Sequence, residues 1–414
     1  RRSSDLNIIQ NHPRKGYEFT AEITPLVAVQ VSKPVNTNIV ILVLLVVLVI
    51  SVLFGFLHYF KDDELAYEQR IVVLPIKNYI DYGEYEWLYL GGMEQLISEL
   101  KGLPSSTLVH QGNYTPRLMH MAGIEREYSS TDVAKLFKVS GASLIVETEV
   151  HGNAADYKFV YKFHISNDIK QGVVLATSIN SGLRELATKL AEFISQPLTL
   201  HDIRPTKEFS DALFAEAMIS YENDWQTSIS FFESYLALNP QSVIAAMYLS
   251  KLYLWEARLD DALDVLVKAD KYVTADVSQQ AEVSLIKGRI ATKQLNWPLA
   301  HQYFNKAESL LEQGNFWLLK ANVAEERGLA FMAQGELTQA HRAFKESLSY
   351  YLIVESPIGI NTSKLHLAAV LTGLGNTARA KQFYLQAKQS IETNNIAFLD
   401  TMLLNYKEKL EVGK

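Results

Sequence analysis

The chain has 414 residues, of which 48% are hydrophobic and 21% charged, a balance typical of folded rather than disordered protein. It contains no cysteine, which excludes disulfides, thiol redox switches, cysteine-ligated zinc and cysteine nucleophiles. The formal net charge of -7 disfavours nucleic acid as a partner for most of the chain. Residues 1–38 nevertheless carry more basic than acidic side chains, so the acidity lies after them.

A short hairpin is expected at the start of the chain. The stretches "IIQNHP" and "YEFTAEI" alternate apolar and polar residues as half-buried strands do, and "RKG" between them forms a basic tip. Gly16 permits the positive φ that a tight turn can need. Two strands alone are marginally stable, so we expect this hairpin to pack on further structure, with Arg1 and Arg2 ending a truncated helix.

Residues 39–57 form the most apolar run, 19 residues without a charge. A helix of this length spans about 29 Å, close to the hydrocarbon thickness of a bilayer of about 30 Å. A buried core helix would have a polar face, and a signal peptide would end in small residues. We therefore expect a transmembrane helix over 39–59. Basic residues precede it and "KDDELAYE" follows it, which predicts a cytoplasmic N-terminus and a periplasmic or extracellular remainder.

Between residues 64 and 200, strand and helix patterns alternate, which predicts an α/β domain with a partly parallel sheet. The helix at "STDVAKLFKVSG" is expected to begin after Ser130 or Thr131 and to stop at Gly141. A hairpin turning at Gly152-Asn153 makes the sheet mixed. Strands are expected near 70–76, 105–111, 143–166 and 172–179, and further helices near 89–102 and 183–198.

From residue 205 to 410 the pattern is helical and repeats itself. A small residue recurs early in the second helix of each unit, at separations of 34, 38, 40 and 40, and a large residue follows four positions later. Antiparallel helices pack closely only where a small side chain faces a bulky one. The small residues are Ser228, Ala262, Ala300, Ala340 and Ala380, and the large ones are Phe232, Leu266, Phe304, Phe344 and Tyr384.

This spacing resembles the tetratricopeptide repeat, and the Asn239-Pro240 turn fits that pattern. The units are longer than usual and the first is degenerate, so five tetratricopeptide-like repeats are expected. The resemblance implies a superhelical stack with a concave groove that holds a peptide or a partner protein.

Motifs of catalysis are not found in the sequence, which lacks HExxH, GxxxxGK[ST], GxGxxG and GxSxG patterns. The ten histidines are scattered, and His110 and His120 are too far apart to form a metal signature. Gly91-Gly92 at a helix start could cradle an anion, although such glycines more often ease a strand-to-helix turn. We expect no enzyme, no catalytic residue, no cofactor and no metal.

The opening "RRSSDLNIIQNHPRKGYEF" resembles the end of an OmpR/PhoB-type winged-helix DNA-binding domain. The positions that match the wing pattern are Ile9, Lys15, Gly16, Tyr17 and Phe19, while Gln10 stands where the family often has threonine. The resemblance implies that the wing tip meets DNA phosphates and that the recognition helix ends at the first two residues. The implied DNA-binding residues are Arg1, Arg2, Arg14, Lys15 and Gly16.

Together with the apolar run, "HPRKGYEF" resembles the ToxR/CadC-like transmembrane transcriptional regulators, and "RIVVLPIKN" with "YLGGMEQLISEL" is similar to TolB-like amino-terminal domains. The implied fold class is a multidomain α+β/α chain. Its expected parts are a winged-helix remnant (1–25), a linker (26–38), a single transmembrane helix (39–59), a mixed α/β sheet domain (64–200) and an all-α tetratricopeptide-like solenoid (205–410).

The first functional reading is a one-component regulator in the bacterial inner membrane that couples a periplasmic signal to DNA binding through one transmembrane helix. Its implied partners are DNA, the lipid bilayer, a periplasmic protein, peptide or small-molecule signal, and a second copy in a homodimer. The alternative is a membrane-anchored tetratricopeptide scaffold that mediates protein–protein interactions in the envelope without DNA binding. A third reading is the sensory part of a cyclase-like enzyme.

Overall fold

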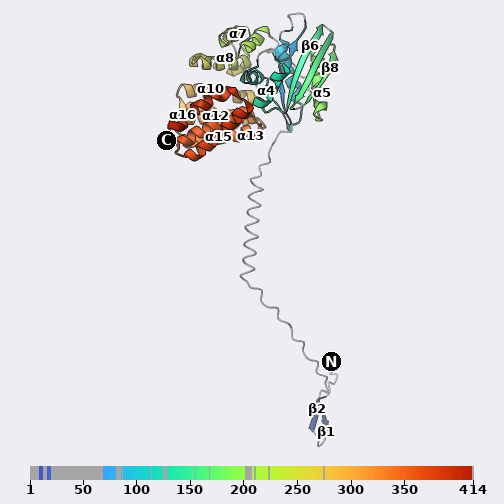
Figure 1. Ribbon diagram of the computed structural model, residues 1–414, viewed down its shortest axis with the longest axis vertical. Coiled ribbons are helices and arrows are strands. Elements are labelled where there is room, and N and C mark those ends of the chain that lie inside the picture. Colours follow the sequence, from blue (N-terminus) through green and yellow to red (C-terminus); the bar gives the residue numbers. More distant parts are fainter. Residues whose placement is uncertain are drawn as a thin grey trace. The chain divides into compact units, whose positions relative to one another are not determined.

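The structure is a computed structural model (Figure 1). It describes residues 9–12, 16–19, 69–80, 85, 87–112, 114–124, 128–153, 155–166, 168–200, 208, 211–221, 224–273 and 276–412. The chain divides into two units, Arg1–Asp63 and Glu64–Lys414.

In the first unit, β1 (Ile9–His12) and β2 (Gly16–Phe19) form an antiparallel hairpin, with Ile9 opposite Phe19 and His12 opposite Gly16. The predicted hairpin is therefore confirmed. The predicted linker and the predicted span over 39–59 lie outside the described residues. None of the helices that the structure describes is both long and apolar enough to cross a membrane.

The second unit contains a mixed sheet, as predicted. Its strands lie in the order β5-β3-β6-β7-β8, and the short β4 pairs with the far end of β6. Strand β3 runs parallel to β5 and β6, whereas β6, β7 and β8 form an antiparallel meander. The strands are β3 (Gln69–Val73), β4 (Lys77–Asn78), β5 (Thr107–Val109), β6 (Leu144–Asn153), β7 (Asp156–Ile165) and β8 (Asp168–Ala176).

The turn between β6 and β7 comes later than predicted. Gly152 and Asn153 stay in the ladder, opposite Tyr157 and Asp156. The left-handed backbone of the turn falls on Ala155, with φ of 70°. Gly152 has φ of 104° inside the strand, and a side chain there would collide with the carbonyl oxygen of Asp156.

Helices cover both faces of the sheet. Helices α2 (Met93–Leu100) and α5 (Ile179–Phe193) share a core with Val146 and Phe159, while α3 (Thr115–Met121) and α4 (Ser130–Ser140) share one with Ile145. A π-helical turn, η2 (Leu88–Gly92), leads into α2. The short α3 was not expected from the sequence.

Helix α4 begins one residue earlier than expected. Its N-cap is Ser129, whose backbone N–H donates to the Asp132 carboxylate at 2.9 Å. The predicted stop at Gly141 is confirmed, because this residue caps the helix with a left-handed φ of 69°.

The rest of the second unit is a stack of paired helices followed by α16, and the predicted helical-hairpin solenoid is confirmed. All five small anchor residues have no exposed surface. A Cβ added at Gly288 would lie 2.4 Å from Phe304 Cε1, and one added at Gly328 would lie 2.6 Å from Phe344 Cε1. The pairs are α6 (Ala212–Ser220) with α7 (Trp225–Leu238), α8 (Val243–Trp255) with α9 (Leu259–Ala269), α10 (Val277–Lys293) with α11 (Trp297–Leu311), α12 (Trp317–Ala333) with α13 (Leu337–Ile353), and α14 (Pro357–Gly373) with α15 (Thr377–Asn394); α16 is Asp400–Val412.

The sheet and the repeats share a core within the second unit. Helix α4 contacts α14, and Gly141 lies so close to the α13–α14 turn that an added Cβ would be 1.9 Å from the Glu355 carbonyl oxygen. Arg70 on β3 forms an ion pair of 2.7 Å with the Glu355 carboxylate. Leu108 on β5 packs against the cluster of Ala321 and Tyr351. The β5 edge of the sheet is thereby covered by the repeats.

The predicted fold class needs one correction. The mixed sheet and the solenoid are confirmed, but the described residues give no support for a winged helix or for a single transmembrane helix. The part of the first unit that the structure describes is a hairpin of two four-residue strands. Hairpins of this size occur in many folds, so the hairpin does not identify a winged helix.

Candidate functional site on the inner face of the repeat stack

The first helices of successive pairs lie against one another. Helix α10 contacts both α8 and α12, and α12 contacts α14. Ion pairs cross between these neighbours: Lys251 on α8 reaches Glu282 on α10 at 2.6 Å, and Arg289 on α10 reaches Glu326 on α12 at 3.1 Å. The first helices therefore form one continuous face of the stack, called the inner face below because the first helices of such repeats usually line the groove.

The repeat spacing of 40 residues identifies equivalent inner-face positions from α10 to α16. All three positions on α12 are charged or polar, whereas two of the three on α10 are apolar and two of the three on α16 are apolar or aromatic. The inner face is thus most polar on α12 and more apolar on α16. The equivalent sets are Glu282, Asn322, Thr362 and Met402; Leu285, Glu325, Leu365 and Asn405; and Ile286, Glu326, His366 and Tyr406.

Glu325 is the most perturbed carboxyl of this face. Desolvation by burial raises its pKa to about 7, and the like charge of Glu326 adds to the rise. The Tyr351 hydroxyl, 2.7 Å from the Glu325 carboxylate and also 2.7 Å from the Asn322 side-chain oxygen, opposes the rise. Arg117, on helix α3 of the sheet domain, opposes it as well. The sheet domain therefore contributes a positive charge to this part of the inner face.

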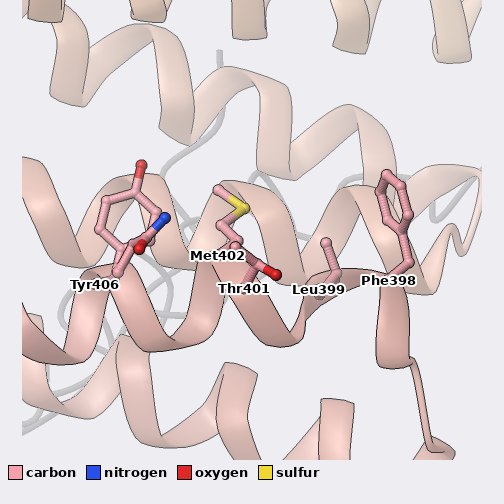
Figure 2. A pocket seen from close by; sticks show the side chains of 6 residues that line it. Phe398, Leu399, Thr401, Met402 and Tyr406 are labelled. Atoms are coloured by element: carbon pink, nitrogen blue, oxygen red, sulfur yellow. The ribbon is translucent and has the colours of Figure 1, made fainter.

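A hollow of about 400 Å³ opens on α16 and on the 3₁₀ turn before it, η5 (Ala397–Leu399). Figure 2 shows the side chains of Phe398, Met402 and Tyr406 along one side of this segment. Phe398 is 47% exposed, whereas Tyr406 is 8% exposed and lies 6.0 Å from the His366 ring on α14. Thr401 and Asn405 complete the lining with Leu399. The hollow can accept an apolar side chain of a partner.

Burial raises the pKa of the Tyr406 phenol to about 12, and the nearby Glu325 charge acts in the same direction. Tyr406 therefore remains a neutral phenol throughout the physiological pH range.

A second cluster of charges lies on the sheet. Glu147, only 3% exposed, accepts hydrogen bonds from Lys77 at 2.7 Å and Lys162 at 3.3 Å and lies 2.8 Å from His164. Burial opposes ionisation, but the hydrogen bonds from His164 and Lys77, together with the lysine charges, hold the Glu147 pKa at about 2. These groups satisfy one another, so the cluster ties β4, β6 and β7 together.

Across the described part of the chain, no group of three or more His, Asp or Glu side chains could hold a metal ion.

The structure describes one of the five residues predicted to bind DNA, so that prediction stays untested. Arg1, Arg2, Arg14 and Lys15 lie outside the described residues, and Gly16 is the first residue of β2. Conversely, the inner-face residues Glu325, Met402 and Tyr406 were not singled out from the sequence. Adding the 40-residue spacing to Thr362 and His366 would have placed Met402 and Tyr406 on the inner face.

Comparisons with known proteins give only distant structural likenesses. No family model and no curated protein matches the chain. The structure is similar to that of MamA, with 19% identity over 45% of this chain and 97% of the other and a TM-score of 0.35. It is also similar to PilW, a type IV pilus biogenesis factor, with 20% identity over 55% of this chain and 89% of the other and a TM-score of 0.37. The apo form of RapI is similar with 14% identity over 44% of this chain and 70% of the other and a TM-score of 0.40. At these scores the fold assignment rests on the helix pairs described above.

The described residues define a stack of paired helices with tetratricopeptide-like spacing, joined to a mixed sheet. The identification with ToxR/CadC-like transcriptional regulators is therefore wrong, and the associated roles in transcription regulation and DNA binding, with DNA and lipid as partners, are not supported.

Proposed function

We propose that the protein is an interaction scaffold that binds a segment of another protein on the inner face of its repeat stack and catalyses no reaction. This agrees with the alternative reading of the sequence rather than with the first one. The observation that carries the proposal is the hollow that Phe398, Met402 and Tyr406 line on η5 and α16. The location in the inner membrane stays a prediction from the sequence alone.

The hollow favours one kind of contact. A large apolar side chain of the partner would bury its surface against Met402 and Phe398, at about 25 cal/mol per Å² of apolar area removed from water. Groups that fill a pocket near the centre of an interface carry most of its binding energy. We therefore expect binding to depend strongly on Met402.

The test uses the full chain and peptides selected from a random library on the wild-type protein. We expect the selected peptides to share a large apolar residue and to bind Met402→Glu at least about 10-fold more weakly, because the new charge would be desolvated. The matched control is Leu385→Glu, at a position of α15 that is 49% exposed. Peptides without a common pattern, or equal binding to both variants, would contradict the proposal.

A further inference from the structure

Among the residues that the structure describes, no strand lies beyond β8, which forms an open edge of the sheet. The repeats cover the opposite edge at β5, whereas β8 ends the strand order and carries three exposed apolar side chains. Ile169 is 47% exposed, Val173 50% and Leu175 73%. In Figure 1, β8 lies at the margin of the sheet away from the helical repeats. An open edge with apolar residues is a template for pairing with another strand.

The backbone N–H and C=O groups of β8 that point away from β7 belong to its odd-numbered residues. The Ile169 N–H takes the Asp168 carboxylate as its acceptor at 2.8 Å, so it points away from β7. Hydrogen-bonding direction alternates along a strand in an antiparallel sheet. Gln171, Val173 and Leu175 therefore also point their N–H and C=O groups outward.

We propose that β8 pairs with β8 of a second copy of this chain, antiparallel and centred on Gly172, to join the two sheets into one. With this centre the nine residues of β8 overlap along their whole length, and outward-pointing residues meet outward-pointing residues. Ile169 then faces the partner's Leu175 and Leu175 the partner's Ile169. These apolar cross-strand pairs lie on the face of the sheet where both side chains are exposed.

Of the possible centres, Gly172 is the one that pairs all nine residues of β8, and charge disfavours a centre on Lys170. Centring the pair on Lys170 would place the two Lys170 side chains directly opposite each other. Centring it on Gly172 separates them by four residues along the strands, roughly 14 Å. It also places no like charges opposite each other. The contact is smaller than a typical stable interface of about 1,600 Å², so we expect a dimer in the micromolar range.

The test is the mass of the full chain by sedimentation between about 1 and 200 µM. We expect a monomer–dimer equilibrium that is abolished by Gln171→Pro, which removes an outward N–H without disturbing the bonds to β7. The control Gln171→Ala keeps that N–H and should dimerise. Circular dichroism would show that both variants are folded. A wild-type chain that stays monomeric at about 200 µM would overturn the proposal.

The register has its own test. In Ile169→Glu/Leu175→Glu, carboxylates would face each other across the dimer, so association should weaken at least about 10-fold. In Ile169→Lys/Leu175→Glu, opposite charges would meet at both positions, so association should return. Equal effects of the two double variants would rule out this pairing.

Discussion

Packing inside two of the helix pairs, α10–α11 and α12–α13, depends on a single glycine in each. Gly328 faces Phe344, and an added Cβ would lie 2.6 Å from the ring. Alanine favours a helix by about 1 kcal/mol over glycine, but overpacking costs about 1–3 kcal/mol. We expect Gly328→Ala to lower the free energy of unfolding by up to about 2 kcal/mol in denaturant titrations. In the double variant with Phe344→Leu the penalty should shrink, and additive losses would argue against this contact.

Glu325 should make stability depend on pH. Its folded-state pKa of about 7 lies above its ordinary value of 4.5, so the protonated form favours the folded state. Its stabilising contribution is complete below about pH 4.5 and is lost as the pH rises through 7. Glu325→Gln removes this loss. We expect the variant to gain about 1–3 kcal/mol relative to wild type between pH 5 and pH 8 in chemical unfolding. If the free energy of unfolding changed with pH equally in wild type and in Glu325→Gln, Glu325 would ionise normally in the folded protein.

For single residues, the sequence predicts the features that depend on local steric fit. The glycine stop at Gly141 and the buried anchors such as Ala300 and Ala340 follow from spacing and backbone preference, and the structure has them. The environment of Glu325 could not be predicted. It depends on Arg117, more than 200 positions away in the chain, and on burial between elements.

At the scale of elements, the end of α4 joins the sheet to the repeats. Gly141 has φ of 69°, and an added Cβ would meet the Glu355 carbonyl oxygen at 1.9 Å. Gly375 has a similar φ of 78°, but nothing lies within 4 Å of such an atom. In both alanine variants the left-handed backbone lowers the free energy of unfolding by about 1 kcal/mol. We expect Gly141→Ala to lose at least about 1 kcal/mol more in thermal or chemical unfolding. Equal losses would mean that the α4–α14 contact is dispensable.

The helix pairs could be predicted because close packing repeats the same small and large residues. Helix α3 could not, because seven residues show no clear period. The contact of Leu108 with the repeats was also missed, since it joins segments more than 200 residues apart. The late turn at Ala155 shows that a glycine inside a strand pattern does not always mark the turn.

For the whole molecule, the sequence resemblance and the structure led to different functions. The winged-helix interpretation depended on a hairpin motif of a few residues, whereas the repeat interpretation depended on periodic positions across half of the chain. The longer pattern is the one that the structure bears out. The sheet domain of the protein shares a core with α14 and supplies Arg117 near Glu325. The sheet and the inner face therefore belong to one unit.

The most direct test is hydrogen exchange of the full chain with and without a selected peptide. If the inner face is the binding surface, the peptide should slow amide exchange in α14 and α16 and leave the second helices α13 and α15 unchanged. Protection confined to α13 and α15, or to the β1–β2 hairpin, would contradict the account.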